Sequence, residues 1–302
     1  MGGTRIRAGA VTTDGQLSSQ TEHLTEACRG PDAVLATIEQ AVTAVGAAGI
    51  AAIGVACAGQ IDPGLGAVVY APNLGWHDVP LGARLASTFG VPVVVDNDVR
   101  AAAWGEFCYG GHGVGSLLAV FVGTGIGSGA VLDGRLWRGA GNSAGELGHT
   151  QVVPDGLPCP CGARGCVEQY ASGSGFHRRL LAAQEAGVAT RLTQLCDGDA
   201  RALTAPMVAA AAHAGDELAG LLWTDCRRYL AMAVANAVTL LNPAALVLGG
   251  GVIESLPELF EDVRGGVLRS TTILARESLK IERARLGAWS GVLGAAALAA
   301  AY

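Results

Sequence analysis

Hydrophobic and polar positions alternate along the first third of the chain in a way that predicts strands and helices in turn. Near the N-terminus, Asp14-Gly15 is typical of the tight turn that joins two strands in a hairpin. The elements expected here are strands over 5–12 and 16–24, a helix from Pro31 to about residue 48, a strand over 50–58, a helix over 81–89 and a strand over 91–95. Strands that alternate with helices predict an α/β layer.

The rest of the chain repeats this alternation and then becomes mainly helical. The elements expected here are a helix over 99–107, a strand over 117–122 that ends in a glycine turn, a continuing strand over 130–132 with its return over 135–138, helices from 173 to about 241, a strand over 244–248, a helix over 256–270, a strand over 280–283 and a closing helix over 291–300. The two hairpins with glycine turns suggest two related lobes.

Composition narrows the class of protein. The chain has 302 residues, 50% of them hydrophobic and 15% charged, which excludes a disordered chain. The net charge is −6 and basic residues are scattered, so direct binding of nucleic acid is not expected. The N-terminus lacks the apolar core of a signal peptide, and Asn236, Asn242 and Pro243 interrupt the most apolar stretch. A soluble, cytoplasmic protein with no membrane partner is therefore expected.

The most specific local signal is a group of metal-binding residue types in a short loop: His149, Cys159, Cys161 and Cys166. Three cysteines and one histidine can fill the tetrahedral coordination sphere of a structural Zn²⁺ ion. The alternative is a set of reduced core thiols, the role expected for the other five cysteines (Cys28, Cys57, Cys108, Cys196 and Cys226).

Two carboxylates flank this loop. Glu146 lies three residues before the histidine, and Glu168 lies two residues after the last cysteine. A metal ion that fixed the loop would also fix both carboxylates, which could then accept hydrogen bonds from a polyol. The alternative is that both are solvated loop charges.

Three glycine-rich turns occur at strand ends: Gly2-Gly3-Thr4, Gly123-Thr124-Gly125-Ile126-Gly127 and Gly249-Gly250-Gly251. Glycine lets backbone N–H groups approach phosphate oxygens, and a threonine hydroxyl adds a further donor. Each turn alone is compatible with an ordinary hairpin, but three of them are typical of a nucleotide site. Neither a Walker loop nor a Rossmann fingerprint is present.

Asp96-Asn97-Asp98 follows the strand over 91–95 and precedes a helix. Open α/β sheets place ligands at the carboxyl ends of their strands. Asp98 can accept a proton from an attacking hydroxyl while Asn97 orients the substrate. The alternative role for Asp98 is a helix N-cap, and the two roles are compatible.

These motifs together resemble the ROK family of sugar kinases and repressors, within the larger sugar kinase/Hsp70/actin fold. The segments that carry the resemblance are Gly2-Gly3-Thr4, Pro72-Asn73-Leu74-Gly75-Trp76, Asn97-Asp98, Gly123–Gly127, Gly145-Glu146-Leu147-Gly148-His149, Cys159–Glu168 and Asn242-Pro243 with the glycines at 249–251. The resemblance implies two RNase H-like α/β lobes of the actin/hexokinase type, with the active site in the cleft between them. The lobes would span 1–108 and 109–288, with a helix over 289–302 packing back on the first.

The resemblance also implies roles for individual residues. Asp98 would be the catalytic base, and the sugar would be held by Asn97, Glu146, His149 and Glu168. ATP would contact the turns with Gly3, Thr4, Gly123, Thr124 and Gly125 through its phosphates, and Gly249 and Gly250 through its adenosine. The expected cofactors are ATP, Mg²⁺ and structural Zn²⁺ held by His149, Cys159, Cys161 and Cys166, and a homodimer or homotetramer is expected.

The expected activity is transfer of the γ-phosphate of ATP to a hexose hydroxyl, the 6-OH, in a glucokinase-like enzyme. The alternatives are an N-acetylglucosamine or N-acetylmannosamine kinase, and a non-catalytic sugar-binding regulator or pseudokinase. One departure motivates the last alternative. Kinases of the family begin with a strand that ends Asp-x-Gly-Gly-Thr-Lys, and here Met1 occupies the x position and Arg5 the lysine position. Either the chain starts further upstream, which we favour, or catalysis is impaired.

Overall fold

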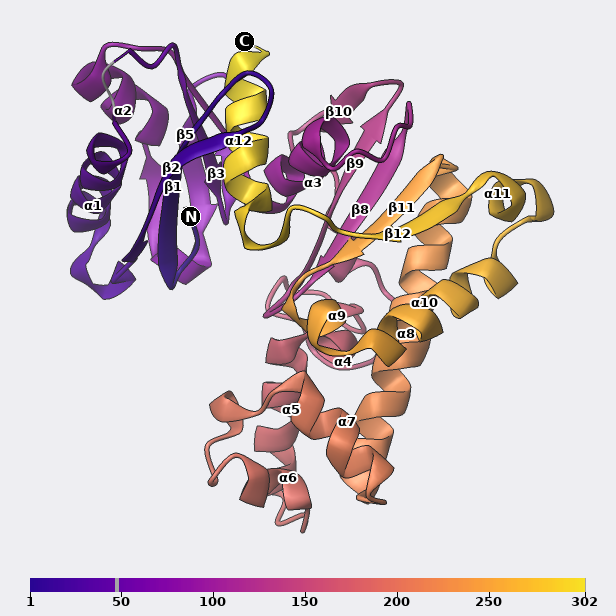
Figure 1. The fold of residues 1–302 in the computed structure, drawn as a ribbon. Helices are drawn as coiled ribbons and strands as arrows, with labels where there is room; N and C mark the ends of the chain where they lie inside the picture. The colour runs from indigo at the N-terminus through magenta and orange to yellow at the C-terminus, as the bar shows by residue number, and fades with distance from the viewer. Residues whose placement is uncertain (47–48, 302) are drawn as a thin grey trace. The chain divides into compact units, whose positions relative to one another are not determined.

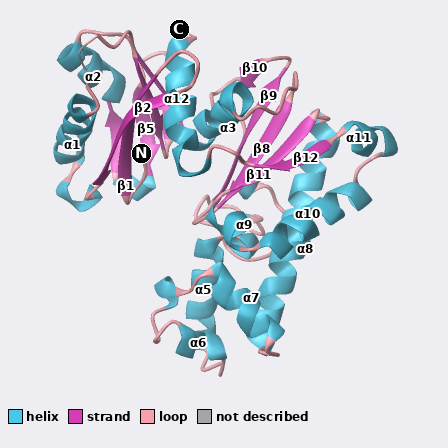
Figure 2. Cartoon of the chain, viewed as in Figure 1, coloured by secondary structure: helices cyan, strands magenta, loops and turns pink. Residues whose placement is uncertain are grey.

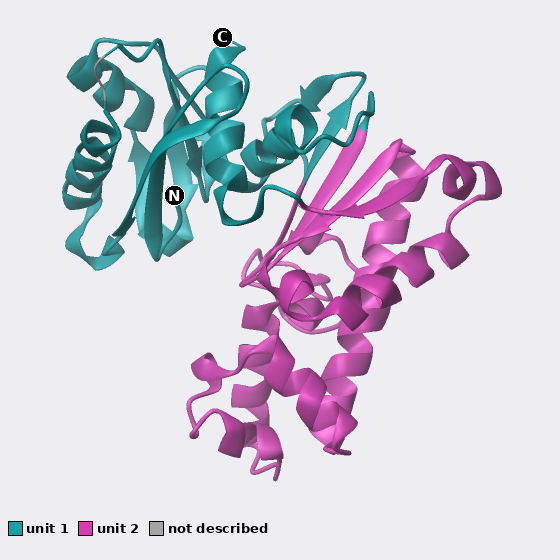
Figure 3. Cartoon of the chain, viewed as in Figure 1, with its two compact units in different colours: residues 1–116, 129–145, 285–302 teal, residues 117–128, 146–284 magenta. Residues whose placement is uncertain are grey.

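The computed structural model describes residues 1–46 and 49–301, which form two compact units. Unit 1 comprises residues 1–116, 129–145 and 285–302, and unit 2 comprises residues 117–128 and 146–284 (Figure 3). Unit 2 contains most of the described helices; all described helices are drawn in cyan in Figure 2. Each unit is described here by itself.

Unit 1 begins with the predicted antiparallel hairpin, formed by β1 (Arg5–Val11) and β2 (Leu17–Leu24). Helix α1 (Pro31–Ala44) follows, with its N-terminal proline in the first turn. The predicted helix extended to residue 48, but α1 ends earlier, and positions 47–48 lie outside the described residues. The central pair is β3 (Ile53–Cys57) parallel to β7 (Val93–Asn97), with α2 (Leu81–Phe89) between them in the chain.

A three-stranded antiparallel sheet that the sequence pattern did not predict fills residues 60–79 of unit 1. It consists of β4 (Gln60–Asp62), β5 (Ala67–Ala71) and β6 (Trp76–Val79), with the 3₁₀ turn η2 (Pro72–Leu74) before the last strand. Trp76 is fully buried in a core that also contains residues of α1 and α2. These strands are too short to show a clear period of two.

Helix α12 (Ser290–Ala300) packs against α3 (Asp98–Tyr109) and β3, and glycines make this close approach possible (Figure 1). A Cβ atom added at Gly294 would run into the carbonyl oxygen of Ala101, and one at Gly54 into the carbonyl oxygen of Ala295. One at Gly105 would lie 2.8 Å from the Ser290 carbonyl oxygen. The backbone segments therefore contact one another directly, and these three positions have no room for a side chain.

The larger sheet has the strand order β10-β9-β8-β11-β12. Its strands are β8 (Leu117–Val122), β9 (Ile126–Leu132), β10 (Arg135–Trp137), β11 (Ala245–Gly249) and β12 (Lys280–Arg283). Strands β8, β11 and β12 run parallel and β10 pairs with β9 in an antiparallel hairpin. Strands β8 and β11 are almost completely buried, as expected for parallel strands covered on both faces.

Helices make up the remainder of unit 2, and α8 (Glu217–Leu241) is the longest of those described. The others are α4 (Glu168–Ala171), α5 (Gly173–Glu185), α6 (Arg191–Leu195), α7 (Ala205–His213), α9 (Gly251–Ser255), α10 (Pro257–Ser270) and α11 (Ile273–Ser278). Short 3₁₀ turns complete the chain: η1 (Ala27–Arg29), η3 (Leu147–His149), η4 (Ala200–Ala202) and η5 (Gly287–Trp289). Within the described residues, none of the helices has both the length and the apolar character needed to cross a lipid bilayer.

The cysteines outside the metal motif divide into two groups. Cys57, Cys196 and Cys226 are buried, as expected for reduced core thiols. Cys28 and Cys108 are exposed, so their expected core role was wrong.

Candidate active site

Unit 1 places Asp98 at the carboxyl end of the β3–β7 pair, as the first residue of α3. The cap of this helix is Asn97, whose Oδ1 accepts hydrogen bonds from the backbone N–H groups of Val99 (3.0 Å) and Arg100 (3.1 Å). The alternative that Asp98 caps the helix is therefore wrong. The neighbouring amide performs this task, because Asn97 has the extended backbone that a cap requires.

The surroundings of the Asp98 carboxyl raise its affinity for a proton. Burial raises its pKa above the usual value for aspartate, while the amino group of Met1 and the backbone N–H of Val99 act in the opposite direction. A carboxylate with a raised pKa holds a transferred proton more readily. Asn97 also donates from Nδ2 to the carbonyl oxygen of Gly59 (3.3 Å), which fixes the orientation of its amide.

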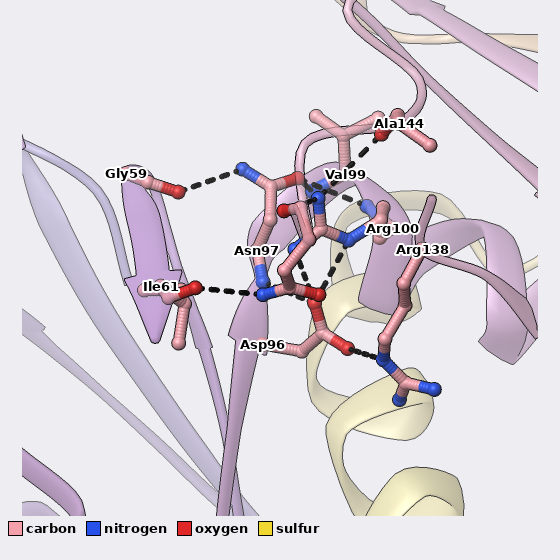
Figure 4. A network of polar contacts seen from close by, with 9 residues as sticks. Gly59, Ile61, Asp96, Asn97, Val99, Arg100, Arg138 and Ala144 are labelled. Atoms are coloured by element: carbon pink, nitrogen blue, oxygen red, sulfur yellow. Dashed lines mark hydrogen bonds and ion pairs between the residues drawn. The ribbon is translucent and has the colours of Figure 1, made fainter. Parts of the chain in front are cut away.

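A buried ion-pair network holds this strand end in place, and the sequence pattern did not identify it. Asp96, whose side chain is 2% exposed, accepts from Nε of Arg100 (2.9 Å) and Nε of Arg138 (2.8 Å) (Figure 4). Arg100 Nη1 also donates to the carbonyl oxygen of Asn142 (2.8 Å), whose own Nδ2 donates to that of Ile61 (2.7 Å). Asp96 was visible in the Asp-Asn-Asp triplet, but nothing local pointed to Arg138, 42 positions later.

The first glycine turn lies at the same end of unit 1. Gly3 is held against the Asn73 carbonyl oxygen, which a Cβ atom at Gly3 would approach to 2.7 Å. Met1, two residues earlier, lines a cavity together with Asp98. Thr4 is exposed, and its carbonyl oxygen accepts from the backbone N–H of Thr25 (2.9 Å). Unit 1 thus gathers four predicted site residues: Gly3, Thr4, Asn97 and Asp98.

Unit 2 brings the other two glycine turns together. Strands β8 and β11 are parallel neighbours, so the turn at 123–125 and the glycines at 249–250 follow adjacent strand ends. Gly250 has a φ of 88°, and a Cβ atom there would lie 2.5 Å from the Val122 carbonyl oxygen, immediately before Gly123. Both turns have backbone N–H groups at adjacent strand ends, and the first turn also carries the exposed Thr124. Such groups are suited to bind phosphate.

Glu168 links the metal-motif loop to the glycine turn. Its Oε2 accepts from the backbone N–H of Ile126 (2.9 Å), and a Cβ atom at Gly125 would lie 2.5 Å from the same oxygen. The Gly148 backbone lies directly against the Ile126 carbonyl oxygen. Glu168 and the segment ending at His149 therefore share one side of the turn.

Glu146 is exposed and directly precedes the 3₁₀ turn η3 as its N-cap residue, and its carbonyl oxygen accepts from the backbone N–H of His149 (3.0 Å). Unit 2 contains all the remaining predicted site residues: Glu146, His149, Glu168, Gly123, Thr124, Gly125, Gly249, Gly250, Cys159, Cys161 and Cys166.

The four metal-ligand candidates converge. The nearest ligand atoms of His149, Cys159, Cys161 and Cys166 all lie within 4.8 Å of one another. A tetrahedral Zn²⁺ site requires about 3.8 Å between two sulfurs and about 3.6 Å between sulfur and nitrogen. The Cys161–Cys166 Sγ distance is 3.7 Å and the distance from Cys159 Sγ to His149 Nδ1 is 3.6 Å. The residues therefore fit this ion, and His149 would bind through Nδ1.

Groups around the cluster complete a metal-binding environment. Gln169 Nε2 donates to Cys159 Sγ (3.3 Å), an outer contact that stabilises a thiolate. The backbone N–H of Ala163 lowers the pKa of Cys161, whereas burial raises the pKa of Cys166 to about 12. A metal ion would thus have to displace protons from the buried thiols, so its binding depends on pH.

Comparisons with known proteins agree with this arrangement. The profile of the family described as "ROK family" matches residues 1–302. The glucokinase of Streptomyces coelicolor is 34% identical over 306 residues, covering 99% of this chain and 95% of that protein. A ROK family glucokinase from Streptomyces griseus, solved in complex with glucose and AMPPNP, superposes with a TM-score of 0.81 at 34% identity, covering 100% of this chain and 98% of that one. A putative xylose repressor from Caldicellulosiruptor is 34% identical over 83% of this chain, which corresponds to 62% of the repressor.

Proposed function

The chain belongs to the ROK family, and from this premise we propose that it is an ATP-dependent hexose kinase, glucokinase-like in its choice of sugar. The chain has the two-lobe α/β fold of the family's kinases. The glucokinases of Streptomyces coelicolor and Streptomyces griseus match it almost end to end, which supports both the reaction and glucose as the first candidate substrate.

The observation that carries the proposal is the placement of Asp98. Its carboxyl lies at the carboxyl end of a parallel strand pair, does not cap the helix and has a raised pKa. In the proposed reaction the 6-OH of the hexose attacks the γ-phosphorus in line and gives its proton to Asp98, while the bond from that phosphorus to the bridging oxygen of ADP breaks. Asn97 Nδ2, which has two N–H groups and uses one on Gly59, can donate to a neighbouring hydroxyl.

The proposed sugar contacts in unit 2 are Glu146, His149 and Glu168. Zn²⁺ bound to His149 through Nδ1 would leave Nε2 available to the substrate, and the same ion would fix the loop that leads into Glu168. The Zn²⁺ ion thus has a structural role, because three thiolates and one imidazole leave it no open position for a substrate.

The proposed ATP contacts are the turns with Gly3 and Thr4, with Gly123 to Gly125, and with Gly249 and Gly250. Their backbone N–H groups would stabilise the phosphate charge that develops during transfer. When bound, Mg²⁺ supplies further neutralisation of that charge. Within the described residues the His149 cluster is the one group of three or more potential metal ligands, so Mg²⁺ would be held chiefly by the nucleotide phosphates.

The proposal is tested by a coupled assay of ADP release with glucose, mannose, allose, fructose, N-acetylglucosamine and N-acetylmannosamine. We expect Mg²⁺-dependent ADP formation that is highest with glucose. Highest turnover with an N-acetylated hexose would replace glucose as the substrate and leave the kinase assignment intact.

A sugar-binding regulator or pseudokinase is the second candidate. The repressor relative supports it. Binding of a hexose in calorimetry, with no ADP formed from any sugar, would favour this candidate over the kinase. We further propose that the protein is cytoplasmic and forms a homodimer or homotetramer. Light scattering of the purified protein tests the oligomeric state.

A further inference from the structure

The start of helix α5 supports the glycine turn at 123–125 within unit 2. The backbone N–H groups of Gly173 and Ser174 donate to the carbonyl oxygens of Gly123 and Thr124, each at 2.9 Å. The contact is close, because a Cβ atom added at Gly173 would lie 3.3 Å from the Gly123 carbonyl oxygen. The conformation of this turn therefore depends on where the first residues of α5 lie.

A chain of three side-chain hydrogen bonds connects the same helix with the metal-ligand cluster. Arg178, one turn after Ser174, donates from Nη2 to Ser174 Oγ (3.0 Å) and from Nε to Gln169 Oε1 (2.9 Å). Gln169 donates from Nε2 to Cys159 Sγ (3.3 Å). All four residues belong to unit 2, so the chain of bonds lies within one compact unit.

The orientation of the Gln169 amide depends on the state of Cys159. The Gln169 side chain is almost completely buried, at 2% exposed, and its amide presents opposite ends to its two partners. The Arg178 guanidinium can only donate, so it requires Oε1. A Cys159 sulfur that binds Zn²⁺ carries no hydrogen and can only accept, so it requires Nε2. A free thiol can donate as well as accept and therefore selects neither end of the amide.

On the basis of the role in ATP binding proposed above for the turn at 123–125, we propose that Gln169 and Arg178 are positioning residues that connect it with the metal cluster. A metal-bound Cys159 holds the Gln169 amide with Oε1 toward Arg178. Arg178 then holds the start of α5, and α5 holds the turn. Coupling between two binding sites is reciprocal, so a nucleotide bound to the turn also raises the affinity of the cluster for Zn²⁺.

Glu168 provides a separate connection from the metal-motif loop to the same turn. Its Oε2 accepts from the backbone N–H of Ile126, whereas the start of α5 bonds Gly123 and Thr124. The two connections thus hold different ends of the turn. Because Glu168 is a proposed sugar contact, loss of the Arg178 bonds should weaken nucleotide binding and leave sugar binding unchanged.

The zinc affinity of the purified protein tests this link without reference to catalysis. It is measured by competition with a chromogenic chelator, with and without saturating AMPPNP and Mg²⁺. We expect AMPPNP to raise the zinc affinity of the unmutated protein by about fivefold or more.

Arg178→Met keeps an unbranched side chain but donates no hydrogen bond. In this variant the effect of AMPPNP on zinc affinity should disappear. Calorimetry should show AMPPNP binding weakened by about fivefold and glucose affinity unchanged. Arg276→Met, at an exposed arginine of α11, is the matched control and should behave like the unmutated protein.

Gln169→Glu tests the metal end of the link. The carboxylate still accepts from Arg178, but an oxygen replaces Nε2 beside Cys159 Sγ. We expect zinc affinity to fall by about tenfold or more, because an outer contact of a metal ligand is lost. The effect of AMPPNP on zinc affinity should disappear here too.

Persistence of the AMPPNP effect in Arg178→Met would show that zinc and nucleotide are coupled through the folding of unit 2 as a whole, and would overturn the link. An unmutated protein that binds AMPPNP with no change in zinc affinity, or that binds no Zn²⁺, would also overturn it. These outcomes leave the proposed kinase function intact. An unmutated protein that binds no AMPPNP would contradict the proposed function together with the link.

Discussion

At the scale of single residues, Asn97 and Asp98 have separate roles: Asn97 caps helix α3, and Asp98 is the proposed acceptor of the proton. Asn97 satisfies the first backbone N–H groups of α3, so the Asp98 carboxyl is available for proton transfer. The sequence identified both residues, because a polar triplet at a strand end is visible locally. The sequence could not show which of the two residues caps the helix, because capping depends on the backbone angles at the start of the helix.

Replacement of Asp98 tests its role as the base. We expect Asp98→Asn to reduce kcat by about 10²–10⁴-fold with little change in sugar affinity, since general-base catalysis contributes about that much. Initial rates and calorimetric sugar titration measure the two quantities. A control is Asp32→Asn, on the exposed first turn of α1, which should leave kcat unchanged. Near-normal turnover of Asp98→Asn contradicts the assignment.

The raised pKa of Asp98 gives the same substitution an effect on stability. A group whose folded-state pKa lies above its unfolded value favours folding when protonated, and loses that contribution as pH rises through the folded value. At pH 7 the ionised carboxylate is therefore unfavourable in the folded state, and Asp98→Asn should raise Tm there. This gain in Tm should shrink as pH falls, because Asp98 then becomes protonated and both proteins carry a neutral side chain at this position. Calorimetric scans from pH 4 to pH 8 measure it.

The arginines around Asp96 differ in burial, and this predicts unequal contributions to stability. Arg100→Met should lower the free energy of unfolding by about 3–5 kcal/mol, because it removes the buried partner of a buried carboxylate. Arg138→Met should cost about 1 kcal/mol or less, since its side chain is 38% exposed and water screens the pair. Urea unfolding of both variants measures the difference. Equal losses would show that burial does not set the strength of these pairs.

At the scale of elements, a hydrogen bond to Glu168 connects the metal-motif loop with the glycine turn of β8–β9. We expect Cys161→Ser to release the metal ion and to weaken sugar binding by about tenfold or more, because the loop loses one of its four ligands. Metal analysis and calorimetry measure the two effects. Cys28→Ser, at an exposed cysteine far from the loop in sequence, is the matched control. Loss of metal with unchanged sugar affinity would show that the loop needs no ion to hold its carboxylates.

Helix α12 depends on glycines that no side chain can replace. Gly294→Ala should lower the free energy of unfolding by about 2–4 kcal/mol, because the added methyl group meets the Ala101 carbonyl oxygen. Gly220→Ala in α8 meets nothing within 4 Å and should instead raise stability by about 0.5–1 kcal/mol. Chemical denaturation of both variants distinguishes steric from entropic effects of the same mutation.

Elements with strong local signals were predicted well, and short ones were not. The hairpin at the N-terminus and helix α2 match the expected residues closely, because turn chemistry and helical period are local. The strand expected over 91–95 begins two residues later, after Pro92, and includes Asp96 and Asn97. Proline cannot donate to a neighbouring strand, so pairing starts beyond it. The sheet of β4, β5 and β6 lacked any long periodic segment to reveal it.

At the scale of the whole molecule, the chain passes between the two units several times, and one carboxylate secures its last return to unit 1. Glu106 of α3 is fully buried and accepts from the backbone N–H groups of Arg285 (3.0 Å) and Leu286 (2.9 Å). His112 Nε2 lies 2.9 Å from the same carboxylate. This connection ties the start of the C-terminal segment to unit 1, and no local pattern in the sequence pointed to it.

We expect Glu106→Ala to lower the free energy of unfolding by about 3 kcal/mol, because the backbone N–H groups of Arg285 and Leu286 lose a fully buried carboxylate acceptor. The segment after Leu286 should also become more sensitive to limited proteolysis. Glu277→Ala, at an exposed residue of α11, should change neither stability nor the cleavage pattern. An unchanged pattern in Glu106→Ala would show that packing of α12 alone retains the segment.

The glycine contacts of α12 also have a consequence at the level of the gene. Any change of a glycine codon that alters the amino acid adds at least a Cβ atom. Gly54 and Gly294 have a backbone carbonyl oxygen where that atom would lie, and Gly105 has one 2.8 Å away. Substitutions at these three codons should therefore be depleted among functional alleles. In a saturation library selected for activity, larger residues should be lost there first and alanine should be depleted, while the alanine codons of α12 retain more substitutions.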